Sequence, residues 1–320
     1  MKKHTSWIAA LILIPLTLSG CTATSGDTTT GASADESVIA VVTHGTAGDS
    51  FWDVVKSGAE QAGADLGATV TYQGDGDPVK QSQLIDAAIA AKPDGLIVSM
   101  ANPAGVKDAV GRAIEAGIPV ITINSGLEES KAFGAQTHVG QSEFIAGQGA
   151  GEQLAKAGVK NVICVIHEAG NSGLEERCNG AADTLGGTLS NVQVDVANIA
   201  DAQNTVKSKL LADPSIDGVL TLNPAVGVAA AQSITEAAST ATLATFDVSA
   251  DVTKLIEAGE ILFAVDQQPY SQGYLPVVFL TLQKRNGDTV GGGRPVYSGP
   301  GYVTKDNVAE VAAFAARGTR

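Results

Sequence analysis

Residues 95–123 read GLIVSMANPAGVKDAVGRAIEAGIPVITI, and this segment indicates the fold class of the chain. Two short apolar runs, Gly95–Ser99 and Pro119–Ile123, flank the stretch Pro103–Ala116, which opens with proline as helices often do. Continuous apolar runs of this length are typical of parallel strands that are covered by helices on both faces. The segment therefore predicts a strand, a helix and a second parallel strand joined by a right-handed crossover.

The same alternation of strands and helices continues on both sides of this segment. Apolar or β-branched runs of strand length recur between helical stretches; they are Ser37–Thr43, Thr69–Gln73, Asn161–Ile166, Val192–Val196, Gly218–Leu222, Thr242–Phe246 and Ile261–Val265. The helical stretch Ser142–Ala157 separates two series of similar plan. We predict an α/β protein with two doubly wound, Rossmann-like lobes in tandem.

The end of the chain has no partner elements of its own. A helix from about Ser271 to Arg285 and a strand-like tail over Arg294–Tyr302 follow the last strand of the second lobe. We expect them to return to the first lobe and to the connection between the lobes. The predicted N-terminal lobe is then 37–141 plus 268–297, and the C-terminal lobe is 142–267 plus 298–312. Several passages of the chain between the lobes would form a hinge beside a cleft.

The N-terminus predicts export and a lipid anchor. Lys2 and Lys3 precede an apolar core, Trp7–Leu18, which is shorter than the ~20 residues that a membrane-spanning helix needs. The run Leu18-Ser19-Gly20-Cys21 resembles the lipobox of bacterial lipoproteins, which are cut before a cysteine that carries the lipid. We expect a signal peptide over 1–20, a lipidated Cys21 and a flexible tether over 21–36, on the outer face of the cell membrane. The alternative is an ordinary secreted protein with an incidental cysteine.

Charge and cysteine usage exclude some partners. The formal charge is −14 and no Lys/Arg cluster stands out, so a nucleic acid is a poor partner. Cys164 and Cys178 could form a disulfide in an oxidising compartment, or remain two buried thiols. No Cys-x-x-Cys spacing occurs and the four histidines are scattered, so we expect no metal and no cofactor.

Polar side chains follow many of the predicted strands. Since ligands of open α/β sheets bind beyond the carboxyl ends of the strands, these residues are the candidates for a binding site. They are His44, Asp49, Ser50, Phe51, Trp52, Asn102, Asn124, Ser125, His167, Glu168, Asn171, Asn223, Asp247, Asp266, Gln267 and Gln268, with Arg177 one or two helical turns beyond a strand. Carboxylates, amides and a guanidinium pair with hydroxyl groups, and aromatic faces pack on C–H surfaces. The set predicts a polyhydroxylated ligand.

Five segments of the chain together resemble the periplasmic sugar-binding proteins of the ribose and galactose type, the receptors of ABC importers. They are GDSFWDVVKSGAEQAG after the first strand, AKPDGLIVS, AGIPVITINS, HVGQSEFIAGQGAGE and ATFD. The resemblance extends from Ser37 to about Asn307. It implies the periplasmic-binding-protein type I fold, a monomer, an ABC permease as partner and no enzymatic activity.

The resemblance also implies which residues bind the ligand. An opening loop supplies a polar residue and stacking aromatics, and strand ends and one helix supply the rest. These positions match Asp49, Phe51, Trp52, Asn124, Ser125, Arg177, Asn223, Asp247 and Gln267, to which we add His44 as a candidate contact. Many pentose and hexose receptors carry an Asp-Arg pair where this chain has Asn124-Ser125, and the third stacking aromatic, expected near Ile199, is absent. A sugar alcohol or a short sugar is therefore a plausible ligand beside a pyranose.

Several candidates also have a purely structural interpretation. Phe51 could be a core residue, Arg177 could pair with Glu175 or Glu176 on the surface, and Asn223 and Asp247 could be helix caps. His44 could be a structural histidine, and we assign His138 and His167 to the connection between the lobes. The glycine-rich segment 147–151 could suggest a dinucleotide-binding loop, but such a loop follows a strand. Because the segment lies inside a predicted helix, we do not expect it to bind a dinucleotide.

Other functions on this fold were weighed against solute capture. An extracellular α/β hydrolase needs a nucleophile with a base, and no Gly-x-Ser-x-Gly elbow occurs. A transcriptional regulator needs a DNA-binding helix pair at the N-terminus, where this chain has a signal-like segment and a Thr/Ser-rich stretch. A partner that presents its ligand to a sensor shares the binding chemistry, and the sequence does not separate it from transport.

Overall fold

The computed structural model describes residues 36–320. The predicted signal peptide, the predicted lipidation site Cys21 and the predicted tether up to residue 35 lie outside the described residues. Within residues 36–320, no helix is long and apolar enough to cross a membrane.

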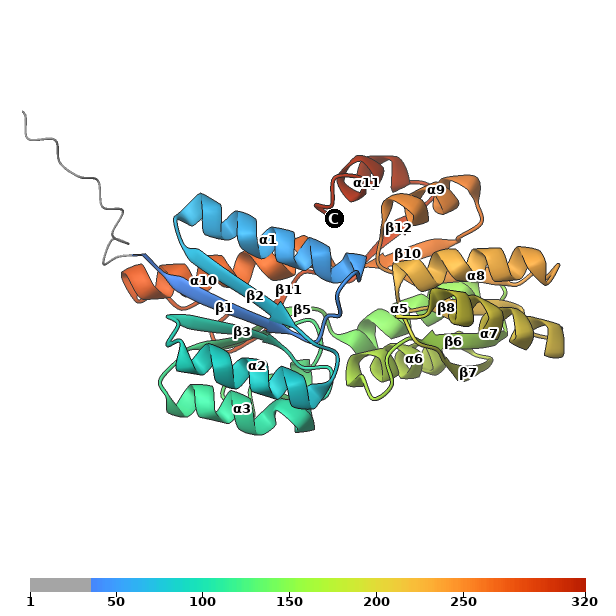
Figure 1. Ribbon diagram of the computed structural model, residues 1–320. Coiled ribbons are helices and arrows are strands. Elements are labelled where there is room, and N and C mark those ends of the chain that lie inside the picture. Colours follow the sequence, from blue (N-terminus) through green and yellow to red (C-terminus); the bar gives the residue numbers. More distant parts are fainter. Residues whose placement is uncertain (1–35) are drawn as a thin grey trace, which may run out of the picture. The chain divides into compact units, whose positions relative to one another are not determined.

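The first lobe is built on a six-stranded sheet in which every neighbouring pair is parallel, in the order β11-β5-β4-β3-β1-β2. Its strands are Val38–Thr43 (β1), Thr69–Gly74 (β2), Gly95–Ser99 (β3), Val120–Ile123 (β4), Thr137–Gly140 (β5) and Val296–Tyr297 (β11). Its helices are Ser50–Leu66 (α1), Pro78–Ala90 (α2), Pro103–Glu115 (α3), Leu127–Ser130 (α4) and Pro269–Asn286 (α10). Helices α1 and α10 pack on one face, and α2 and α3 on the other (Figure 1).

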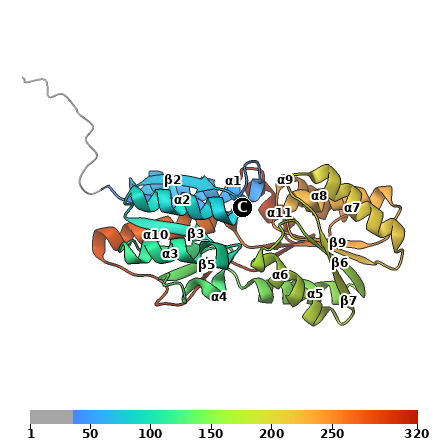
Figure 2. The same cartoon turned by 60° about the horizontal axis from the view of Figure 1, so that its bottom comes forward.

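The second lobe repeats this plan, with the strand order β12-β10-β9-β8-β6-β7. Its strands are Asn161–Ile166 (β6), Thr188–Gln193 (β7), Gly218–Thr221 (β8), Thr242–Phe246 (β9), Phe263–Asp266 (β10) and Gly301–Thr304 (β12). Its helices are Glu143–Lys156 (α5), Ser172–Leu185 (α6), Ile199–Ala212 (α7), Pro224–Glu236 (α8), Ala250–Ala258 (α9) and Val308–Ala315 (α11). Helices α5 and α6 cover one face, and α7, α8, α9 and α11 the other (Figure 2). The predicted class, two Rossmann-like lobes, is confirmed.

The chain passes between the sheets three times. It crosses from β5 to α5, returns from β10 to α10, and crosses again from β11 to β12. The last passage is short, because the strand-like tail predicted over 294–302 is divided: β11 pairs with β5, and β12 pairs antiparallel with β10. This arrangement is the predicted multi-crossing hinge.

Two details of the predicted strands were wrong, one in each lobe. The strand after α6 is Thr188–Gln193 rather than the predicted Val192–Val196. The prediction failed because this is an edge strand, whose side chains are mostly exposed and form no long apolar run. The apolar residues Val192 and Val194 are buried in the core at and beyond its end. Strand β5 was not predicted, since its four residues, Thr137–Gly140, include a threonine and a histidine. Because His138 belongs to this strand, it is buried in the first sheet and does not lie in the connection between the lobes.

The glycine-rich segment lies inside helix α5 and serves helix packing. A Cβ atom at Gly147 would lie 2.2 Å from the carbonyl oxygen of Arg177, and one at Gly151 would lie 2.3 Å from that of Ala181. Only glycine permits α5 and α6 to approach this closely. The packing fixes the position of Arg177 on α6, and the segment is not a dinucleotide loop.

Candidate functional site

The carboxyl ends of the strands from both lobes meet at one pocket. All ten residues predicted as ligand contacts line it: His44, Asp49, Phe51, Trp52, Asn124, Ser125, Arg177, Asn223, Asp247 and Gln267. Five further residues complete the lining: His167, Glu168, Asn171, Leu174 and Leu222. The room left at the centre is about 30 Å³, enough for one or two waters, because the lining side chains bond one another across the cleft.

The loop between β1 and α1 supplies the acidic and aromatic part of the first lobe. Asp49 caps α1, since its Oδ1 accepts a hydrogen bond from the backbone N–H of Phe51 at 3.0 Å. Burial, with a smaller contribution from the nearby charge of Glu168, raises the pKa of Asp49 to about 6. The rings of Phe51 and Trp52 meet edge to face at 5.1 Å. Both side chains pack in the core of the first lobe and also line the pocket. Their positions are therefore compatible with a structural role and with ligand contact.

His44 lies where the two lobes meet. Its Nδ1 is 2.7 Å from Ser99 Oγ in the first lobe, and its Nε2 is 3.5 Å from Asn171 Nδ2 and 3.7 Å from Glu168 Oε2 in the second. Burial, together with the charge of Arg177, lowers the pKa of His44 to about 3. The imidazole is therefore neutral at physiological pH, and it is both a strand-end residue held by Ser99 and a part of the pocket.

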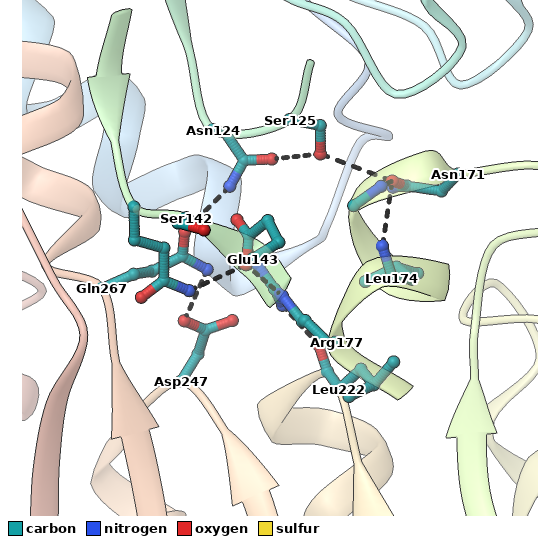
Figure 3. Close-up of polar contacts among 12 residues, drawn as sticks. Asn124, Ser125, Ser142, Glu143, Asn171, Leu174, Arg177, Leu222, Asp247 and Gln267 are labelled. Carbon is teal, nitrogen blue, oxygen red and sulfur yellow. Dashed lines mark hydrogen bonds and ion pairs between the residues drawn. The ribbon is translucent and has the colours of Figure 1, made fainter. Parts of the chain in front are cut away.

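A chain of side-chain hydrogen bonds connects the lobes at the base of the pocket (Figure 3). Asn124 Nδ2 donates to Gln267 Oε1 at 3.0 Å, and Gln267 Nε2 donates to Asp247 Oδ1 at 2.9 Å. Ser125 Oγ donates to Asn124 Oδ1 at 3.0 Å and lies 3.4 Å from Asn171 Oδ1. These amide, carboxylate and hydroxyl groups come from the ends of three strands, β4, β9 and β10, and from the cap of α6.

Asn124 and Asp247 occupy equivalent places in the two lobes, each directly after a strand. Their backbones are left-handed, with φ of 61° and 67°. Asn and Asp adopt this conformation more readily than other residues with a Cβ atom, and such residues cluster at functional sites. Asp247 is not a helix cap, because Ser249 caps α9. Burial raises the pKa of Asp247 to about 7, although the charge of Arg177 lowers it in part.

Arg177 lies at the pocket, but its guanidinium is bound to a residue that sequence analysis missed. Its Nε and Nη2 donate to the two carboxylate oxygens of Glu143, at 2.6 and 3.1 Å, and both side chains are buried. Its Nη1 donates to the carbonyl of Leu222, and the group stacks on Phe246 at 4.5 Å. Burial opposes the charge of Arg177, yet Glu143 raises its pKa above the usual value. Surface pairing with Glu175 or Glu176 is therefore wrong, and no sequence motif distinguishes Glu143 from an ordinary acidic residue in a first helical turn.

His167, Glu168 and Asn171 follow β6 and were among the strand-end residues, though not among the predicted contacts. Asn171 caps α6 through Oδ1, which accepts from the N–H of Gly173 at 3.1 Å, and its Nδ2 donates to Glu168 Oε2 at 2.6 Å. His167 lines the pocket instead of belonging to the connection alone. The position after a strand was the signal that could have identified all three.

The surroundings of the pocket hold one covalent link and a second cavity. Cys164 in β6 and Cys178 in α6 form a disulfide, which ties the helix that carries Arg177 to the sheet. A cavity of about 600 Å³ adjoins the pocket and shares His44, His167, Glu168 and Asn171 with it. No group of His, Cys, Asp and Glu side chains in residues 36–320 has the arrangement of a metal site.

Comparison with known proteins identifies the class of this chain. Residues 39–286 match the periplasmic binding protein domain, and the chain belongs to that family. The ribose import binding protein of Haemophilus influenzae is 24% identical over 284 residues, which cover 87% of this chain and 92% of that protein. The xylose/arabinose-binding protein of Sulfolobus acidocaldarius is 26% identical over 242 residues, and the match spans 70% of this chain and 60% of its length.

Solved structures agree with this assignment. A carbohydrate transporter from Acidothermus cellulolyticus in complex with myo-inositol has a TM-score of 0.88 and 42% identity, covering 89% of this chain and 100% of that one. A solute-binding protein of an ABC transporter from Agrobacterium vitis, bound with α-D-tagatopyranose, has a TM-score of 0.77 and 25% identity, covering 88% and 99%. The predicted resemblance to the sugar-binding receptors of ABC importers is confirmed at the level of the family.

Proposed function

We propose that this chain is the substrate-binding protein of an ABC importer and captures a neutral monosaccharide or sugar alcohol between its lobes. The observation that carries the proposal is the set of polar groups from both lobes at one pocket, joined from Asn124 through Gln267 to Asp247. These amides and carboxylates offer the paired donors and acceptors that hydroxyl groups need. One named relative is a ribose import binding protein and the other a xylose/arabinose-binding protein, which supports a role in capture rather than catalysis.

A cyclic polyol is our first choice of ligand. The protein of 42% identity holds myo-inositol. Ser125 stands where many pentose and hexose receptors have an arginine, and the one arginine of the pocket is bound to Glu143. A ligand whose hydroxyl groups donate to carboxylates fits this chemistry better than one that needs a second guanidinium.

The proposed mechanism is closure of the hinge on the ligand. In the structure the lobes bond each other directly through Asn124, Gln267 and Asn171, so an incoming polyol must replace these bonds with its own. Contacts to both lobes favour the closed state over the open one. Micromolar binding corresponds to about 8 kcal/mol, which several hydrogen bonds and a packed aromatic face can supply.

The proposed setting is the outer face of the cell membrane. We propose that Cys21 is lipidated after removal of residues 1–20, and that the lobes 37–141 plus 268–297 and 142–267 plus 298–312 work as a monomer beside a permease. A Cys21→Ser variant should leave the membrane fraction while the unchanged protein stays in it. Equal membrane association of both proteins would refute the anchor, and sedimentation equilibrium tests the monomer.

A thermal-shift panel tests the proposed ligand class. Sugars, sugar alcohols and cyclic polyols, including myo-inositol, are compared with amino acids, short peptides and inorganic anions. A true ligand at 100 times its Kd stabilises the folded state by about 2.7 kcal/mol and raises Tm. At least one neutral polyol or sugar should do so; stabilisation by amino acids, peptides or anions alone overturns the proposal.

A further inference from the structure

The pocket has an excess of negative charge. Three carboxylates line it, those of Asp49, Glu168 and Asp247, against the single guanidinium of Arg177. That guanidinium is already paired with a fourth carboxylate, that of Glu143. The two imidazoles do not compensate, because burial lowers the pKa of His44 to about 3 and that of His167 to about 4. An anionic ligand would therefore meet repulsion here, whereas a cationic one would be attracted.

The hydrogen-bonding groups of the pocket are unequally used. Three of the four amides of the pocket already donate to a protein acceptor: Asn124 to Gln267, Gln267 to Asp247, and Asn171 to Glu168. Acceptors remain without a donor within residues 36–320. Asp247 is bonded through Oδ1 only, which leaves its second carboxylate oxygen as an acceptor. Nδ1 of His167, a residue 7% exposed, has neither a donor nor an acceptor as partner. The free carboxylate oxygen of Asp247 therefore favours a ligand that brings a strong donor.

The adjoining cavity has the same electrostatic character. Besides Glu168, its lining includes Asp195 and Asp201, and no lysine or arginine from the described part of the chain lines it. Glu168 connects the two spaces, since its side chain is 18% exposed and it lines both. The cavity and the pocket are thus both lined by carboxylates, which raises the local concentration of cations.

We propose that the pocket also binds polyols that carry a protonated amine, such as amino sugars and aminocyclitols, and that it prefers them to their neutral counterparts. The inference rests on the proposed function, because the same pocket and the same hinge hold both ligands. An ammonium group donates three hydrogen bonds and accepts none, whereas a hydroxyl group donates one. Bonds between an ammonium and a carboxylate are about twice as strong as bonds between neutral groups.

The state of the buried carboxylates agrees with this preference. Burial raises the pKa of Asp49 to about 6 and that of Asp247 to about 7, so neither charge is well compensated by the protein alone. An ammonium group beside them would supply the missing positive charge.

Matched ligand pairs test the inference by titration calorimetry on the whole protein. The pairs are myo-inositol with an amino-deoxy inositol, and D-galactose with D-galactosamine, with N-acetylgalactosamine as a neutral nitrogen control and galacturonate as an anion. The amine of at least one pair should bind about tenfold more tightly at low salt, and the advantage should shrink as salt is raised from about 0.01 to 0.3 M. The anion should not compete.

Three variants separate a local charge effect from a structural one. Asp49→Asn keeps a helix cap and an acceptor but removes the charge. Glu168→Gln keeps an acceptor and removes the charge where the cavity meets the pocket. Each should lower the ratio of the two affinities, amine over neutral, at least threefold, whereas loss of structure alone would weaken both ligands equally. Glu60→Gln removes an exposed charge from α1, outside the pocket, and should leave the ratio unchanged.

The outcomes are distinguishable from failure of the proposed function. Tight binding of neutral polyols with equal or weaker binding of every amine overturns the inference and leaves the proposed function intact. An amine preference that Glu60→Gln reduces as much as Asp49→Asn also overturns it, since the cause would then be net charge. Failure of all sugars, polyols and amines to bind overturns both.

Discussion

The buried ion pair at the pocket wall yields a prediction with a definite magnitude. Glu143→Gln keeps the size of the side chain but removes the charge that faces Arg177. The two side chains are 2% and 4% exposed, and two hydrogen bonds of 2.6 and 3.1 Å join them. The substitution therefore leaves the buried guanidinium of Arg177 without its charged partner. Arg177 lies on helix α6 and lines the pocket.

Removing one partner of a buried pair typically costs about 3–5 kcal/mol. Arg177 keeps the carbonyl of Leu222 and the ring of Phe246, and a glutamine at 143 retains one acceptor oxygen, so we expect the lower end, about 3 kcal/mol. For a chain of this size that loss lowers Tm by roughly 6–12 °C.

Urea-induced unfolding, followed by circular dichroism, measures this loss. The matched control is Glu152→Gln on the same helix, where Glu152 is 57% exposed and lies 3.8 Å from Lys156. A surface pair of this kind contributes about 0–1 kcal/mol, so the control should stay within about 0.5 kcal/mol of the unchanged protein. If Glu143→Gln and Glu152→Gln lose the same stability, the buried pair does not have the role assigned to it.

Three further perturbations have definite outcomes. Gly147→Ala should destabilise by about 1–3 kcal/mol because a Cβ atom there would lie 2.2 Å from a carbonyl oxygen of α6, whereas Gly111→Ala, with no atom within 4 Å, should not; equal urea midpoints would contradict the close packing. Asp247→Asn should gain stability relative to the unchanged protein as pH rises from about 4 to 7. The pKa of Asp247 is about 7 in the folded state and 3.8 as its ordinary value, so ionisation destabilises the native state. A difference in Tm between the two proteins that does not change with pH would contradict the buried charge. Cys178→Ser should lose about 3 kcal/mol, the value expected for a disulfide between residues 14 apart, and the same loss should follow reduction of the unchanged protein.

Much of the fold was readable from the sequence because its signals are local. Buried central strands such as Gly95–Ser99 are continuous apolar runs, and helices such as α3 and α8 begin with an Asn-Pro pair at the cap. The edge strand β7 was misplaced for the opposite reason, since its exposed side chains carry little hydrophobic pattern. Strand β5 is too short for periodicity to show.

The pocket divides in the same way. Residues that follow a strand could be predicted, because the carboxyl ends of the parallel strands of a lobe lie at one edge of its sheet. Glu143 could not, because its pairing with Arg177 depends on the close approach of α5 and α6 in space. The net charge of the pocket likewise depends on which carboxylate forms the ion pair with Arg177. No single stretch of sequence shows which residue that is.

The central claim is that the cleft binds a polyhydroxylated ligand through the strand-end residues of both lobes. Its most direct test is titration calorimetry with the polyol or sugar that raises Tm most, on the unchanged protein and on Asp247→Asn, a change that retains a residue tolerant of the left-handed backbone found there. We predict a Kd in the micromolar range or below, weakened at least tenfold by the substitution. No heat of binding from any sugar or polyol, or equal affinity of the two proteins, would contradict the claim.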